Sequence, residues 1–150
     1  RPHLVKAIDG VDTPPAFDSP ILLHNPRNWD VAIGGMHEVA QGPRGTARKA
    51  FLGAPYTVAG KTGTTQVVGI AQNEKYDAAK LAERQRDHGL FVAFAPVDNP
   101  QIAVAVIVEN GNSGSGAAAP VARKVLDAWL LGQSPTPTTP ATTTDNGVEE

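Results

Sequence analysis

The sequence predicts an α+β fold in which helices pack on an antiparallel sheet. Residues 90–95 (LFVAFA) and 101–109 (QIAVAVIVE) are strongly strand-forming. They are joined by residues 96–100, a turn-rich link of hairpin length. Amphipathic helical patterns lie on both sides of this strand region, and their apolar faces can cover a sheet.

The first element expected is a helix over residues 29–41. Asn28 can cap its start, and the pair at 42–43, Gly-Pro, supplies a stop. Gly34 and Gly35 inside it should each cost roughly 1 kcal/mol relative to alanine, so we expect another backbone to pack closely there. The apolar residues that recur at helical spacing are Trp29, Ile33, Met36 and Ala40.

A strand rich in valine and threonine is expected over residues 56–70, followed by a short helix at 78–86 within a charged segment. After the hairpin, a flexible glycine-rich loop at 111–116 leads to a closing helix that ends at Gly132. The tryptophans at 29 and 129 are both predicted to pack in the core. The apolar face predicted for the closing helix consists of Val121, Val125, Leu126, Trp129 and Leu130.

Composition limits the classes of partner. The 150 residues carry a net charge of −2, so there is no basic field for nucleic acid, and we expect none as a partner. The absence of cysteine excludes disulfides and thiolate metal sites, and no apolar run approaches the roughly 20 residues that span a bilayer. Asp87 and His88 predict a structural hydrogen-bonded cluster at a loop–strand junction, since no third ligand is spaced nearby. We expect no cofactor and no metal.

The chain divides by composition at residue 131. Residues 1–131 have the composition of a folded domain or a large part of one, whereas residues 132–150 predict a disordered, acidic, Pro/Thr-rich tail with almost nothing to bury. The start at Arg1 rather than methionine suggests an excised piece of a longer protein.

Residues 58–68, VAGKTGTTQVV, are the stretch that carries chemistry. Gly60, Lys61 and Thr62 invite comparison with a phosphate-binding loop, but that motif requires glycine where Pro55 stands. It must also open a helix, whereas residues 64–70 are strand-forming. The nucleotide interpretation therefore fails.

The same residues fit the Lys-Thr-Gly element of serine acyl-transfer enzymes that act on penicillin-type substrates. On a strand, Thr62 and Thr64 project from one face, where two hydroxyls can hold a substrate carboxylate in the field of a nearby ammonium. Gly63 leaves room for whatever packs behind the strand, and the Thr64 N–H can serve as an oxyanion donor. We expect Lys61 and Thr64 to be catalytic. The expected substrate-binding residues are Thr62, Gly63, Thr64 and Thr65.

The order of several segments resembles the class B penicillin-binding proteins over about residues 1–132. These segments are GPRGTA at 42–47, AGKTGTTQV at 59–67, LFVAFAP at 90–96 and NPQIAVAV at 99–106. The segment AERQRDH at 82–88 is similar to the elongation-specific branch of that family. Several matches in the right order are far more specific than one tripeptide.

The resemblance implies the C-terminal portion of a penicillin-binding, serine β-lactamase-like transpeptidase domain. In that family a serine attacks the D-Ala-D-Ala amide of a peptidoglycan stem peptide and the acyl group passes to an amine of a neighbouring strand, while β-lactams imitate the substrate. Lys61 would contribute electrostatics, Thr62 and Thr64 would bind carboxylate, and the Thr64 N–H would join the nucleophile's own N–H in the oxyanion hole. The resemblance also implies a periplasmic domain of an inner-membrane protein, with elongation-machinery proteins as possible partners.

This sequence departs from the family in lacking the Ser-x-x-Lys and Ser-x-Asn elements. None of its serines has lysine three positions later or asparagine two positions later; they are Ser19, Ser113, Ser115 and Ser134. We expect both elements on an upstream part of the same protein, so that this chain supplies the Lys-Thr-Gly strand but not the nucleophile. Two alternatives stay open: a D,D-carboxypeptidase or β-lactamase-like hydrolase, and a non-catalytic interaction module of the cell-wall machinery.

Overall fold

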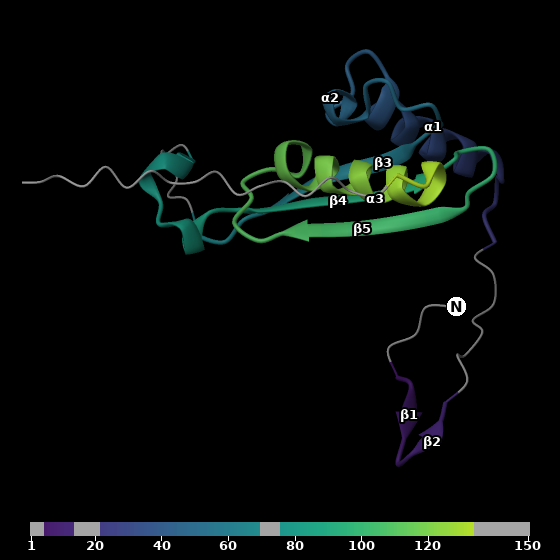
Figure 1. Ribbon diagram of the computed structural model, residues 1–150, viewed down its shortest axis with the longest axis horizontal. Coiled ribbons are helices and arrows are strands. Elements are labelled where there is room, and N and C mark those ends of the chain that lie inside the picture. Colours follow the sequence, from purple (N-terminus) through teal and green to yellow (C-terminus); the bar gives the residue numbers. More distant parts are fainter. Residues whose placement is uncertain (1–4, 14–21, 70–75, 134–150) are drawn as a thin grey trace, which may run out of the picture.

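The computed structural model describes residues 5–13, 22–69 and 76–133. Its centre is a three-stranded antiparallel sheet in the order β3–β4–β5, with helices on one face (Figure 1). The strands are β3 (Ala59–Thr65), β4 (His88–Ala95) and β5 (Ile102–Val108). The α+β prediction, with helices on an antiparallel sheet, is confirmed.

Alternation along β4 explains why one face of the sheet is covered. Gly89, Phe91, Ala93 and Ala95 are buried, whereas the intervening Val92 is 46% exposed. Side chains alternate between the two faces of a strand, so the buried set forms one apolar surface. The helices α1, α2 and α3 contribute buried residues to the same core.

The first helix, α1 (Arg27–Gln41), begins two residues earlier than predicted. The predicted cap was wrong: Asn28 lies inside the first turn, and the Asn25 side chain accepts a hydrogen bond from the Arg27 N–H at 3.0 Å. The expected close backbone packing at the two central glycines was also wrong. Apart from the adjoining residues and backbone of α1 itself, no atom of the described residues lies within 4 Å of a Cβ placed at Gly34 or Gly35.

The strand predicted over residues 56–70 is shorter, because β3 starts at Ala59 and ends at Thr65. Residue 70 lies outside the described residues. The helix predicted at 78–86 is instead two separate 3₁₀ turns, η1 (Ala78–Lys80) and η2 (Glu83–Gln85). The Asp77 side chain caps the first turn by accepting from the Ala79 N–H at 3.1 Å, which favours a short turn over a continuous helix.

The hairpin and the closing helix were predicted correctly. Strands β4 and β5 pair in register, with Phe91 opposite Val106, and α3 (Ala119–Leu131) ends at Gly132 in the left-handed conformation, φ 65°. The glycine-rich loop was predicted too long: its end forms η3 (Gly114–Ala118), a single π-helical turn that leads directly into α3.

The buried face of α3 differs from the predicted one. Ala119, Ala122 and Leu126 are fully buried, whereas Val121 and Trp129 are 44% and 65% exposed. The helix carries two adjacent apolar stripes, and the alanine stripe faces the sheet. The second stripe lines an open apolar cavity of about 500 Å³ formed by Ile102, Val121, Lys124, Val125, Ala128 and Trp129. The prediction that both tryptophans pack in the core was wrong, since Trp29 is 50% exposed.

Two smaller elements complete the described chain. The strands β1 (Ala7–Ile8) and β2 (Val11–Asp12) pair with each other in a separate short ladder. The helix α2 (Arg48–Phe51) brings Phe51 into the core, where its ring stacks on Phe91 with centroids 5.5 Å apart. None of the described helices is long and apolar enough to cross a membrane. The predicted tail falls on residues 132–150, of which 134–150 lie outside the described residues.

Candidate active-site strand

The Lys-Thr-Gly residues lie on β3, which is an edge strand of the described sheet. Lys61 and Thr64 are exposed, and Thr62 and Gly63 are half-buried. The Lys61 Nζ donates to the Thr62 carbonyl at 2.7 Å and forms no ion pair with any described residue. The predicted ammonium and hydroxyls are therefore accessible along a strand that has an unpaired side within the described chain.

The strand is backed at Gly63 by η3. A Cβ on Gly114 would lie 2.5 Å from the Gly63 carbonyl oxygen and 2.9 Å from the Gly63 nitrogen, and it would also meet the Leu90 carbonyl oxygen. Only glycine at position 114 permits this approach without displacing backbone. The expectation that another segment packs against the strand at Gly63 is confirmed.

Side chains of α1 hold the residues that lead into β3. The Gln41 amide donates to the Tyr56 carbonyl at 3.1 Å and accepts from the Val58 N–H at 2.8 Å. His37 Nδ1 lies 3.1 Å from the Val58 carbonyl oxygen. These contacts satisfy backbone groups as a neighbouring strand would, and they fix where β3 begins. These contacts could not be predicted from the sequence, because no local pattern links residues that are 15 to 21 positions apart.

A second polar cluster joins Tyr56 to α3. The Tyr56 hydroxyl donates to Asp127 Oδ1 at 2.6 Å, and Arg123 Nε donates to both Asp127 oxygens at 2.8 Å. Arg123 Nη1 donates to the Ala50 and Leu52 carbonyls at 3.3 and 3.1 Å. Burial, and then the hydrogen bond to Asp127, raise the pKa of the Tyr56 hydroxyl above its usual range. The hydroxyl therefore stays a neutral donor near pH 7.

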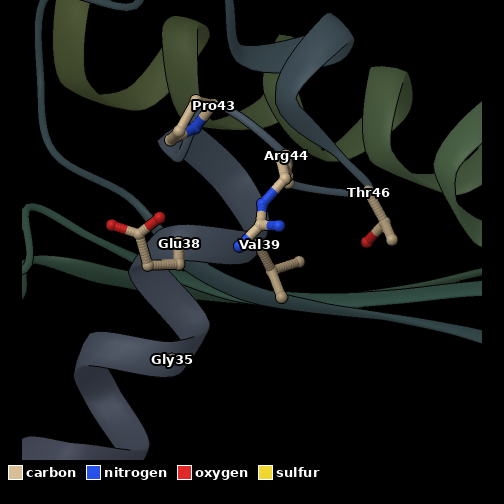
Figure 2. A pocket seen from close by; sticks show the side chains of 7 residues that line it. Gly35, Glu38, Val39, Pro43, Arg44 and Thr46 are labelled. Atoms are coloured by element: carbon tan, nitrogen blue, oxygen red, sulfur yellow. The ribbon is translucent and has the colours of Figure 1, made fainter.

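The loop after α1 touches the strand through a threonine. Thr46 Oγ1 lies 3.1 Å from Thr62 Oγ1, and Thr46 also lines an open cavity of about 360 Å³. Figure 2 shows the cavity from close by, with Arg44 and Thr46 on the loop that follows α1. The cavity lining consists of Gly35, Glu38, Val39, Pro43, Arg44, Gly45 and Thr46. A hydroxyl of the Lys-Thr-Gly strand is thus connected to a hollow on the surface.

The junction between residue 67 and β4 contains the predicted hydrogen-bonded cluster. Asp87, which is 7% exposed, accepts from the Val67 N–H at 3.3 Å, and its own N–H donates to the Tyr76 hydroxyl at 3.0 Å. His88 Nδ1 accepts from the Asn110 N–H at 2.9 Å. Both side chains bond to backbone, so the structural interpretation is confirmed. The described residues hold no group of three or more histidine, cysteine or acidic side chains that could bind a metal ion.

The serines of the described residues are Ser113, which precedes η3, and Ser115 within it. Ser113 Oγ accepts from the Gly116 N–H at 2.9 Å and lies 3.4 Å from Ser115 Oγ. Neither hydroxyl contacts a lysine or histidine within the described chain, so neither has the base that activates a serine nucleophile.

Comparison with known proteins gives the context for this strand. Residues 1–127 match the penicillin binding protein transpeptidase domain. The chain is 47% identical over 134 residues to the peptidoglycan D,D-transpeptidase MrdA of Haemophilus influenzae, covering 86% of this chain and 20% of that protein. It is 46% identical over 139 residues to MrdA of Escherichia coli K12, covering 90% and 22%. The chain therefore spans about a fifth of the length of these curated relatives.

Solved structures agree with the sequence relatives. The chain resembles Pseudomonas aeruginosa PBP2, solved in complex with WCK 5153, with 52% identity and a TM-score of 0.66 over 87% of this chain and 26% of that one. It also resembles PBP2 of Helicobacter pylori in a complex with MreC, with 28% identity and a TM-score of 0.56 over 71% and 18%.

Proposed function

Because this chain belongs to the penicillin-binding protein transpeptidase family, we propose that it completes the active site of a peptidoglycan D,D-transpeptidase that acts in cell elongation. The single observation that carries the proposal is the position of Lys61, Thr62 and Thr64 on an accessible edge strand beside a cavity. A free strand edge can align an extended peptide by main-chain hydrogen bonds.

In this proposal the terminal carboxylate of the stem peptide binds the hydroxyls of Thr62 and Thr64, in the positive field of Lys61. The reacting carbonyl oxygen accepts from the Thr64 N–H, and loss of one such oxyanion donor typically lowers the rate about 10²- to 10³-fold. Gly63 and Thr65 belong to the same strand and contact the main chain of the stem peptide. The support is geometric, since η3 and the Gln41 side chain hold the strand at both its centre and its start.

The nucleophile belongs to an upstream part of the same protein that carries Ser-x-x-Lys and Ser-x-Asn. Its serine oxygen bonds to the carbonyl carbon of the D-Ala-D-Ala amide, the amide C–N bond breaks, and the departing D-alanine amine takes a proton. β-Lactams bind as imitations of this substrate. The domain is proposed to be periplasmic and to belong to an inner-membrane protein, and residues 1–131 form its C-terminal part. The MreC complex of the Helicobacter pylori relative supports a partner from the elongation machinery.

The proposal is tested on the complete protein that contains this chain. Labelled penicillin should acylate a serine upstream of residue 1, and a stem-peptide donor should give a cross-linked product when an amine acceptor is present. Covalent label on Ser113 or Ser115 would contradict the assignment. Hydrolysis alone, with no product of acyl transfer to the acceptor, would favour a carboxypeptidase.

A further inference from the structure

The loop that follows α1 is folded tightly against the last turn of the helix. The Gly42 N–H donates to the Glu38 carbonyl and the Ala47 N–H donates to the Val39 carbonyl, each at 3.0 Å. A Cβ on Gly45 would lie 2.5 Å from the Val39 carbonyl oxygen, so the loop could not approach so closely with a larger residue there. Backbone contacts therefore hold the loop against the helix.

Arg44 lies on this loop, and its guanidinium has no bonding partner among the described residues. Its exposed guanidinium makes no hydrogen bond or ion pair with any residue among 5–13, 22–69 and 76–133. In contrast, Arg123 on α3 makes four charge-assisted hydrogen bonds, two to a carboxylate and two to carbonyls, at most 3.3 Å long. The packing of the described residues does not explain Arg44, whereas a ligand with a planar anionic group would.

The charge around Arg44 favours an anion. Residues 43–49 contain Arg44, Arg48 and Lys49 and no acid, and all three cations are exposed. The acid that lines the cavity is Glu38, and Figure 2 shows its carboxylate turned away from the Arg44 guanidinium. A carboxylate is an anionic group that can pair with a guanidinium fork through two hydrogen bonds.

The contact between Thr46 and Thr62 indicates where the cavity lies relative to the substrate bond that breaks in the proposed reaction. Thr62 is the proposed contact of the substrate carboxylate, and that carboxylate belongs to the D-alanine that leaves. Because the Thr46 hydroxyl lies 3.1 Å from that of Thr62, the cavity adjoins the leaving-group side of the bond that breaks. The body of the donor peptide extends from the other side. In the proposed reaction, the cavity is therefore accessible to the acceptor amine that replaces the leaving D-alanine.

We propose that this cavity is the acceptor subsite, where the Arg44 guanidinium binds a second carboxylate of the incoming amine. This inference rests on the proposed transpeptidase function. The acceptor amine forms a C–N bond to the acyl carbon, the ester C–O bond to the serine breaks, and the proton lost by the amine passes to the serine oxygen. The α-carboxylate of the acceptor takes the place that the D-alanine carboxylate has left at Thr62 and Thr64. Its distal carboxylate reaches Arg44, with Thr46 at the boundary.

The test measures how the acyl-enzyme of the complete protein divides between water and an added amine. D-Glutamate and D-glutamine serve as acceptors, because they differ only in a distal carboxylate or carboxamide. The unmodified protein should transfer its acyl group to D-glutamate about tenfold more efficiently than to D-glutamine. Arg44→Gln should bring that ratio close to one, with Arg44→Lys in between because lysine keeps the charge but not the fork.

Lys49→Gln is the matched control, since it removes one exposed positive charge from the same segment without touching the cavity. It should leave the tenfold ratio unchanged. All rates are normalised to the amount of protein that labelled penicillin acylates, which separates a folding defect from a binding defect.

Three results would overturn the subsite: a ratio near one in the unmodified protein, a ratio that Arg44→Gln leaves intact, or a ratio that Lys49→Gln lowers equally. Failure of the proposed transpeptidase function would give a different result from failure of the subsite. In that case labelled penicillin would not acylate the unmodified protein at all, and no acyl-enzyme would exist to divide.

Discussion

Two polar regions flank the start of β3, and they use their polar groups in opposite ways. In the cluster of Tyr56, Arg123 and Asp127, every charged group has a partner inside the molecule and the ion pair is only 18–20% exposed. Along the strand edge, Lys61 and Thr64 are exposed and hold few internal contacts. The comparison indicates that the first region stabilises the fold, while the polar groups of the second are accessible, as the proposed ligand site requires.

The largest expected effect is on stability, from Asp127→Ala. This change leaves the guanidinium of Arg123 and the hydroxyl of Tyr56 without their partner, in a region that is mostly shielded from water. We expect a loss of about 3 kcal/mol in the free energy of unfolding of the complete protein. Urea denaturation measures this change in the free energy of unfolding. A loss below about 1 kcal/mol would show that the pair behaves like a surface ion pair.

Gly114→Ala should affect both regions. The added methyl group would meet the backbone of Gly63 and Leu90, so η3 or β3 must shift. Overpacking of this kind costs typically about 1–3 kcal/mol. We expect about 2 kcal/mol of destabilisation together with slower acylation by labelled penicillin, because the proposed active-site strand itself moves. Gly116→Ala is the control, since its nearest contact is the Ser113 hydroxyl at 3.0 Å rather than backbone. Equal acylation in both variants would contradict the account.

Thr62→Val combined with Thr64→Val should change function with little change in stability. Both side chains are near the surface, and valine keeps their shape and their preference for a strand. Each lost charge-assisted hydrogen bond to a carboxylate is worth about 1.5–3 kcal/mol, so acylation should fall roughly tenfold or more. Stopped-flow acylation by a penicillin measures this rate. Acylation at the unmodified rate would remove both hydroxyls from the site.

The smallest effect expected is a dependence of stability on pH. The pKa of Tyr56 is raised in the folded protein above its ordinary value of 10.0. The stabilisation linked to this shift is therefore fully present below about pH 10, and it is lost as the pH rises further toward the folded pKa, with a slope of at most about 1.4 kcal/mol per pH unit. Tyr56→Phe should flatten the decline above pH 10, and Tyr76→Phe is the matched control. An identical decline in Tyr56→Phe would contradict the burial argument.

Local patterns predicted the fold better than they predicted its contacts. The strand-forming composition of β4 and β5 and the glycine stop at Gly132 are local signals, and these elements formed where they were expected. Helix α3 was located correctly but its buried face was not, because two apolar stripes share one helix and only packing decides between them. The cap of α1 was wrongly assigned to Asn28, because the helix starts two residues earlier than predicted and its N-cap position is Pro26.

The candidate site was predictable only in part. The motif located residues 61–65 and predicted a strand there, as the structure has it. Thr46, Gln41 and Gly114 could not be connected to that strand from the sequence. Each reaches it across at least 15 positions, and side-chain contacts over such separations leave no periodic signal. The catalytic and substrate-binding roles of the strand residues stay predictions.

The central claim is that the edge of β3 receives the carboxylate end of the substrate. A crystal structure of the complete protein acylated by a penicillin tests it most directly. We expect the carboxylate of the bound penicillin to lie within about 2.5–3.2 Å of the hydroxyl oxygens of Thr62 and Thr64, next to Lys61. A carboxylate bound elsewhere, with these two hydroxyls facing only solvent, would contradict the account.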